Sequence, residues 1–102
     1  MINNKTMSLV GLATKAGKTA SGEFSTEKAV KTGKAYLVLV AEDASENTKK
    51  KFRNMCTFYE VSLYFLSDKE GLGRAMGKEF RASLAVMDES FAQAMQKELS
   101  IK

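Results

Sequence analysis

The chain has 102 residues, 44% of them hydrophobic, a net charge of +4 at pH 7 and a single cysteine, Cys56, so it fits one domain with its own core and without an internal disulfide. Its longest apolar run, Ala35–Ala41, is too short to span a bilayer, and its first residues lack the apolar stretch of a signal peptide, which predicts a cytoplasmic protein. The absence of histidine removes the usual proton carrier near neutral pH and predicts a protein that is not an enzyme.

Apolar residues at helical spacing predict a first helix over residues 5–16. They are Leu9, Leu12, Ala13 and Ala16, with Val10 beside them. Gly17 is a suitable helix terminator because it adopts a left-handed conformation without strain. A very short extended piece, Thr19–Ser21, is expected to follow.

A second helix is predicted over Ser25–Thr32, with Gly22 leading into it and Gly33 ending it. Ala29 and Val30 are expected to face the core. The run Tyr36–Val40 follows and is continuously apolar and rich in residues that favour strands. Such a run is typical of a strand that is covered on both faces.

The rest of the chain continues to alternate between helix and strand. The predicted elements are a helix over Glu46–Tyr59, a strand over Val61–Leu66, a short helix over Lys69–Met76, a strand over Ala82–Met87 and a last helix over Glu89–Ser100. Ser45 and Asp68 are suitable N-caps because their side-chain oxygens can accept from free N–H groups of the first turn. This alternation predicts an α/β domain over residues 1–102, with helices on both faces of a central sheet.

The positive charge is concentrated in the first third of the chain. Residues 1–34 hold six lysines against two glutamates, whereas residues 35–67 hold four basic and four acidic groups and residues 68–102 hold six of each. A one-sided positive patch attracts polyanions such as nucleic acid. A solvated basic surface without a partner would show the same excess, so charge alone leaves both interpretations open.

A second basic cluster, Lys49–Lys51 with Arg53, falls on the helix predicted over Glu46–Tyr59. Four acids lie near it in the sequence, namely Glu42, Asp43, Glu46 and Glu60. A solvated helix face with internal charge balance is the favoured interpretation of this cluster.

No motif predicts a cofactor, a metal ion or a small-molecule substrate. The segment Gly11–Thr19 resembles a phosphate-binding loop, but five residues separate its glycines where that motif has four, and a helical pattern precedes it. No Cys/His cluster offers a zinc site. Cys56 lies on an apolar helical face and lacks a histidine partner, which favours a buried structural thiol over a nucleophile.

Several motifs in order along the chain resemble one known family. Gly22–Ala35 followed by Leu37–Asp43, and later Leu72–Gly77, resemble the kink-turn-binding ribosomal proteins, a family that includes the archaeal large-subunit proteins seven-A and thirty-e. Gly11–Ala13 with Ala16–Lys18, and Ala41–Thr48 with Cys56, are similar to its bacterial YlxQ branch. Each motif is short, but together they cover nearly the whole chain in one register.

The resemblance implies a three-layer α-β-α sandwich around a mixed, mostly four-stranded sheet. It implies non-enzymatic binding of structured RNA, a kink-turn or related bent internal loop, in association with the ribosome. Carried over residue by residue, the RNA-binding residues are Gly22, Phe24, Ser25 and Lys28 at the start of the second helix, the loop residues Lys78, Glu79, Phe80 and Arg81, and the flanking Lys18, Lys31 and Lys34. Phe80 would then stack on an extruded base, whereas the sequence alone also allows it to face the core.

One position departs from the family pattern. Typical members carry Asn-Glu where this chain has Phe24-Ser25, and phenylalanine cannot make the hydrogen bonds that read purine edges. General RNA binding survives this change more easily than strict kink-turn specificity does. An alternative stays open, in which the same fold is a protein-interaction module that uses the acidic residues Glu42 and Asp43 and does not bind RNA tightly.

Overall fold

The structure, a computed structural model, describes residues 4–100, in which helices and strands alternate as the sequence predicts. In chain order the elements are α1 (Asn4–Lys15), β1 (Thr19–Ser21), α2 (Glu23–Lys31), β2 (Leu37–Val40), α3 (Glu46–Tyr59), β3 (Ser62–Phe65), α4 (Lys69–Ala75), β4 (Ser83–Val86) and α5 (Glu89–Leu99). None of the helices described is long and apolar enough to cross a membrane.

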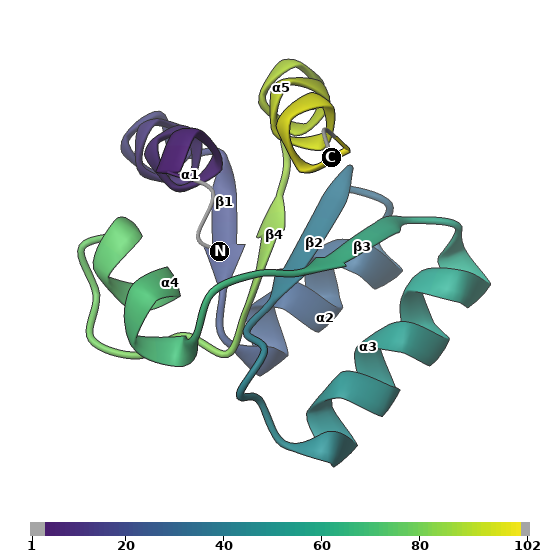
Figure 1. Ribbon diagram of the computed structural model, residues 1–102. Helices are drawn as coiled ribbons and strands as arrows, with labels where there is room; N and C mark the ends of the chain where they lie inside the picture. Colours follow the sequence, from purple (N-terminus) through teal and green to yellow (C-terminus); the bar gives the residue numbers. More distant parts are fainter. Residues whose placement is uncertain (1–3, 101–102) are drawn as a thin grey trace.

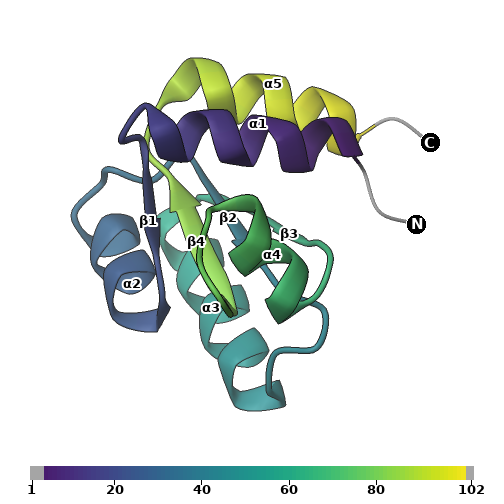
Figure 2. The same ribbon diagram turned by 90° about the vertical axis from the view of Figure 1, so that its left-hand side faces the viewer.

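The four strands form one mixed sheet in the order β1-β4-β2-β3. β2 and β3 are parallel, with Val38 opposite Leu63, whereas β4 runs antiparallel to both of its neighbours. Helices α2 and α3 cover one face of the sheet and α1, α4 and α5 cover the other (Figure 1). Figure 2 shows α1 and α5 side by side over the sheet. This arrangement confirms the predicted three-layer α-β-α sandwich.

The two central strands supply the core on both faces of the sheet. Every residue of β2 and β4 is buried, and alternate side chains point to opposite faces. Leu37 and Leu39 join the cluster under α1, α4 and α5, whereas Val38 and Val40 join Phe52 and the cluster under α2 and α3. Burial on both faces explains why the sequence of β2 is continuously apolar.

Three helices begin at side-chain caps. Ser45 Oγ accepts from the Thr48 N–H at 3.1 Å, and Asp68 Oδ1 accepts from the Gly71 N–H at 2.7 Å, as the sequence predicts. Asp88 caps α5 in the same way. Each cap satisfies one of the N–H groups that a helix leaves without an internal partner.

Helix α2 begins differently, at Glu23, two residues before the predicted start at Ser25. Its N-cap is Gly22, whose φ of 91° and ψ of 158° suit glycine and strain other residues. This conformation turns the chain from the end of β1 directly into the helix, and the Thr26 N–H donates to the Gly22 carbonyl at 2.9 Å. The helix therefore includes the two residues, Glu23 and Phe24, that the sequence assigns to the connection between β1 and α2.

Two aromatic or apolar positions differ from their predicted surroundings. On α1 the buried residues are Thr6, Val10 and Ala13, whereas Leu12 is 55% exposed because it faces away from the sheet. Tyr36 precedes β2 and is also exposed, so the strand begins one residue later than predicted.

Candidate nucleic-acid interface

The start of α2 and the loop that precedes β4 are fastened to each other. The Gly22 N–H donates to the Ser83 carbonyl at 3.0 Å, and Arg81 Nε donates to Ser21 Oγ at 2.9 Å. Behind them Ser83 Oγ donates to Thr26 Oγ1 at 3.3 Å in a buried position. The structure thus brings together two predicted RNA-binding segments that lie about sixty residues apart in the sequence.

The N-terminus of α2 is open to solvent. Gly22 has no side chain with which to accept from the first N–H groups, and the intrahelical ladder begins with Thr26. Glu23, Phe24 and Ser25 are all exposed there. Free N–H groups and the positive end of the helix dipole make such a terminus suited to a phosphate group.

The lysines on this face fall into two kinds. Lys28 and Lys34 are exposed and form no ion pair with any residue in the described part of the chain. Lys31 instead pairs with Glu27, Nζ to Oε2 at 2.7 Å. Lys28 and Lys34 are therefore the cations of α2 and its C-terminal end that can meet a phosphate without first breaking an ion pair.

Lys51 of α3 neutralises the acids of the same face. Its Nζ lies 2.7 Å from Glu27 Oε1 and 3.0 Å from Glu23 Oε2. The hydrogen bonds from Lys31 and Lys51 lower the pKa of Glu27 from 4.5 to about 2. Both glutamates of the first third of the chain are thus paired, and their repulsion toward a polyanion is reduced.

This arrangement corrects the interpretation of the second basic cluster. Lys49 pairs with Glu46 at 3.6 Å, as its neighbours in sequence suggest, but Lys51 pairs with α2. Arg53 lies over the Phe65 ring, 5.2 Å from its centroid. No local signal could reveal the Lys51 contacts, because Lys51 and Glu23 are 28 residues apart.

Phe24 lines two hollows on the exposed face of α2. Its side chain is 78% exposed and lines a shallow hollow of ≈ 330 Å³ with Lys28 and Lys31. A second hollow of ≈ 230 Å³ extends from Phe24 past Lys28 to Lys34 and Met87. The structure therefore gathers most of the predicted residues of this segment on one surface.

Lys18 lies at the far end of this surface. Its carbonyl accepts from the Met87 N–H at 2.8 Å, and Met87 lines the hollow that also contains Lys34. β1 begins directly after Lys18 and ends directly before Gly22, so the strand separates the two. Lys18 can thus flank the surface but does not reach the start of α2.

The loop before β4 is held against α4 by a glycine. The Lys78 N–H donates to the Gly73 carbonyl at 2.7 Å, and a Cβ on Gly73 would overlap the Glu79 carbonyl. Phe80 is 62% exposed and lies outside β4, so its core-facing interpretation is wrong. Arg81 is fixed by Ser21 and by the Phe80 carbonyl, which leaves Lys78, Glu79 and Phe80 as the exposed side chains of the loop.

One of the two acidic residues of the alternative protein-binding surface serves the fold. Asp43 Oδ1 accepts from the Lys69 N–H at 2.9 Å, at the start of α4, where Asp68 is the cap. Together with Glu42 and Ser67 they line a hollow of ≈ 380 Å³. At least two of its three carboxylates therefore hold the α4 terminus in place.

The remaining chemistry of the described residues gives little support to catalysis. Burial raises the pKa of the Cys56 thiol to about 11, so the thiol stays protonated at neutral pH. Residues 4–100 contain no group of three His, Cys, Asp or Glu side chains that could hold a metal ion. What the surface around α2 offers is open N–H groups, unpaired lysines and exposed phenyl rings.

Known proteins are similar to this chain over nearly its whole length. Residues 4–96 match the model of the Ribosomal protein L7Ae/L30e/S12e/Gadd45 family. The RNA-binding protein YlxQ of Bacillus subtilis is 42% identical over 87 residues, which cover 85% of this chain and 87% of that protein. This similarity confirms the resemblance to the YlxQ branch.

Solved structures show the same fold. A protein of unknown function from Bacillus halodurans C superimposes with a TM-score of 0.92 and 34% identity, covering 95% of this chain and 98% of the other. The Giardia lamblia 15.5kD RNA binding protein has a TM-score of 0.79 at 22% identity, covering 91% and 80% of the two chains. The chain belongs to the Ribosomal protein L7Ae/L30e/S12e/Gadd45 family.

Proposed function

We propose that this chain binds structured RNA, a kink-turn or a related bent internal loop, without catalysing a reaction on it. The RNA-binding face comprises the loop 78–81, the flanking Lys18, Lys31 and Lys34, and four residues at the start of α2, namely Gly22, Phe24, Ser25 and Lys28. One observation carries the proposal: the uncapped start of α2 is fastened through Arg81 and Ser21 to a loop that exposes Lys78 and Phe80.

The chemistry of this face suits a bent RNA with unpaired bases better than a regular duplex. A phosphate fits the open N–H groups after Gly22, with Lys28 one turn away. The exposed Phe80 ring can stack on a base only where that base has left its helix. A bent internal loop presents both a close backbone and extruded bases, whereas a regular duplex presents neither an unpaired base nor a sharp turn.

The family supports the same class of partner. The Bacillus subtilis relative is named an RNA-binding protein, and the name of the family refers to ribosomal proteins. On this proposal the natural target is structured RNA, with ribosomal RNA and the ribosome as candidate partners, in the cytoplasm. No cofactor, metal ion or small-molecule substrate takes part.

A calorimetric titration of the native chain against two RNAs tests the proposal. One RNA contains a kink-turn and the other is an unbent duplex of equal length and end sequence. We expect tight binding to the kink-turn RNA, weak binding to the duplex, and a linear fall of log affinity with log salt concentration. Equal affinity for both RNAs, or none for either, would remove the specific proposal.

Lys28→Ala is the matching variant. Because Lys28 forms no ion pair within residues 4–100, its loss should weaken RNA binding and reduce the salt slope by about one phosphate contact, with little change in stability. Lys50→Ala, which removes another exposed lysine, on α3, is the control. If the two variants bind alike, the face is wrongly placed.

The same titration addresses the protein-interaction alternative. An apolar protein interface loses little affinity as salt rises, whereas phosphate contacts lose much. The caps formed by Asp43 and Asp68 at α4 already give those acids a structural role. Salt-insensitive binding of a protein partner, together with no RNA binding, would favour the alternative.

A further inference from the structure

Phe24 leaves an aromatic ring in solvent at a position where nothing in the fold requires one. It is the second residue of α2 and is 78% exposed, whereas the buried side chains of this helix are Thr26, Ala29 and Val30. A phenyl ring gains stability by leaving water, so its exposure beside the RNA-binding face provides an apolar surface for a ligand.

The ring stands next to an unpaired cation. Phe24 and Lys28 are four residues apart and so share one face of α2, and both line the two shallow hollows described above. The small side chain of Ala20 also lines the second hollow. The hollows fit a flat ring better than a bulky ligand, because their volumes of ≈ 330 and ≈ 230 Å³ lie at or below the low end of small-molecule pockets.

The neighbouring groups specify the kind of ring. The open N–H groups of α2 suit a phosphate. The phenyl ring suits a planar aromatic group that lies within one nucleotide of that phosphate. Lys28 and Lys34 can meet the phosphates on either side. An aromatic plane with anions next to it is the chemistry of an unpaired nucleotide.

We propose that Phe24 and Lys28 form a subsite for one unpaired nucleobase of the bound RNA. This inference rests on the proposed function and deepens it. The base stacks on the Phe24 ring, and Lys28 contacts its phosphate. Because a phenyl ring has no hydrogen-bonding group, the subsite accepts any of the four bases.

The proposal distinguishes two kinds of contact on one helix. Lys28 and the free N–H groups bind the backbone wherever the RNA turns closely enough. Phe24 instead requires that one base be free of its stack at that point. The preferred RNA therefore carries an extruded or bulged nucleotide facing the start of α2, in addition to the one that Phe80 can hold.

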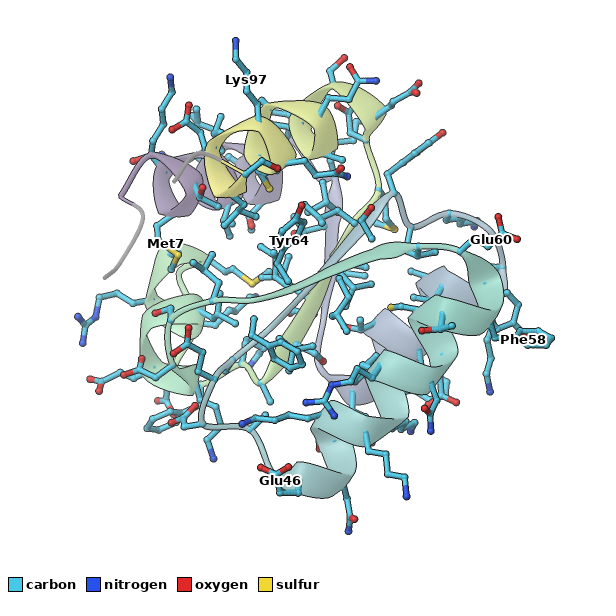
Figure 3. The ribbon with its side chains drawn as sticks, turned by 45° about the vertical axis from the view of Figure 1, so that its right-hand side comes forward. Met7, Glu46, Phe58, Glu60, Tyr64 and Lys97 are labelled. Atoms are coloured by element: carbon cyan, nitrogen blue, oxygen red, sulfur yellow. The ribbon has the colours of Figure 1, made fainter. Side chains whose placement is uncertain are left out.

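Phe24→Leu is the direct test, with Phe58→Leu as a matched control. Phe58 is also 78% exposed but lies near the end of α3, and Figure 3 shows it pointing away from the domain. Loss of one stacked base should weaken kink-turn RNA binding about 5- to 150-fold in Phe24→Leu, with no change in Phe58→Leu. Phe24→Trp should restore the affinity, because its ring also stacks.

Abasic substitution identifies the nucleotide. Each unpaired position of the kink-turn RNA is replaced in turn by an abasic site and titrated with the native chain and with Phe24→Leu. At one position the two losses should fail to add, because both remove the same contact. Replacing that nucleotide with each of the other bases should change affinity less than about fivefold.

The outcomes separate this inference from the proposed function. If Phe24→Leu binds as tightly as the native chain while Lys28→Ala is weakened, the base subsite is wrong and RNA binding stands. If the losses add at every position, or one base is preferred more than about fivefold, the stacking subsite is also wrong. If the native chain binds none of the RNAs, both proposals fall.

Discussion

The N-termini of α2 and α3 lie on the same side of the sheet (Figure 1). They differ in whether a side chain accepts from their first N–H groups. Ser45 closes α3, since its hydroxyl accepts from the Thr48 N–H, whereas Gly22 leaves the N–H groups of α2 open. Both termini have an acid in the first turn, Glu46 and Glu23, and both acids pair with lysines. A helix terminus whose N–H groups are satisfied internally stabilises the fold, whereas a terminus left open can bind a ligand.

The loop beside the open terminus depends on Gly73. Gly73→Ala would place a Cβ against the Glu79–Phe80 backbone, which cannot move as a flexible side chain can. We expect a loss of about 1–3 kcal/mol in the free energy of unfolding, measured in urea, together with weaker RNA binding. Displacement of the loop would break its contact with the start of α2.

Arg74→Ala is the neighbouring control on α4. Arg74 is exposed and pairs only with Glu70 among the described residues, so its loss should cost less than about 1 kcal/mol. Native-like stability and native RNA affinity in Gly73→Ala would show that this loop is not fixed by the glycine.

Ser45→Ala sharpens the contrast between the two helix starts. Loss of the hydroxyl that accepts from the Thr48 N–H should cost about 1 kcal/mol of unfolding free energy. RNA affinity should not change, because this terminus lies outside the proposed face. A large loss of RNA affinity in a folded Ser45→Ala protein would mean that α3 takes part in binding.

The smallest expected effect concerns the charges that join α2 to α3. The pKa of Glu27 is lowered from 4.5 to about 2 by its pairing with Lys31 and Lys51. This pairing stabilises the fold at pH values above 4.5, and the stabilisation is lost as the pH falls toward 2. Thermal unfolding between about pH 5 and pH 2 should therefore show a steeper loss of stability for the native chain than for Glu27→Gln.

High salt should reduce this difference, because the pairs are partly exposed and are screened. If Glu27→Gln shows the same acid-dependent loss as the native chain, the coupling between α2 and α3 contributes nothing to stability.

Much of the fold could be predicted because its signals are local. A continuous apolar run predicted β2, helical spacing predicted α1, and Ser45 and Asp68 predicted two helix starts. The start of α2 was placed two residues late, because the conformation of Gly22 cannot be seen in a residue pattern. Leu12 shows the same limit, since spacing alone does not say which face meets the sheet.

The candidate site was predicted through the resemblance rather than through local physics. Charge marked the segment that contains Lys28 and Lys34, but no pattern in the residues linked it to Phe80. The Phe24-Ser25 departure was visible in the sequence, whereas the exposure of the Phe24 ring was not.

Spacing, capping and composition act over a few residues, so the sequence alone predicted the order of the elements, the buried strand β2 and the basic first third. Local sequence could not show which charges stay free. Lys51 reaches Glu23 and Glu27 from another helix, and Arg81 reaches Ser21 from a distant loop, so Lys28 and the open N–H groups are left to face solvent. Contacts between distant residues depend on the packing of the three layers, and local sequence does not contain them.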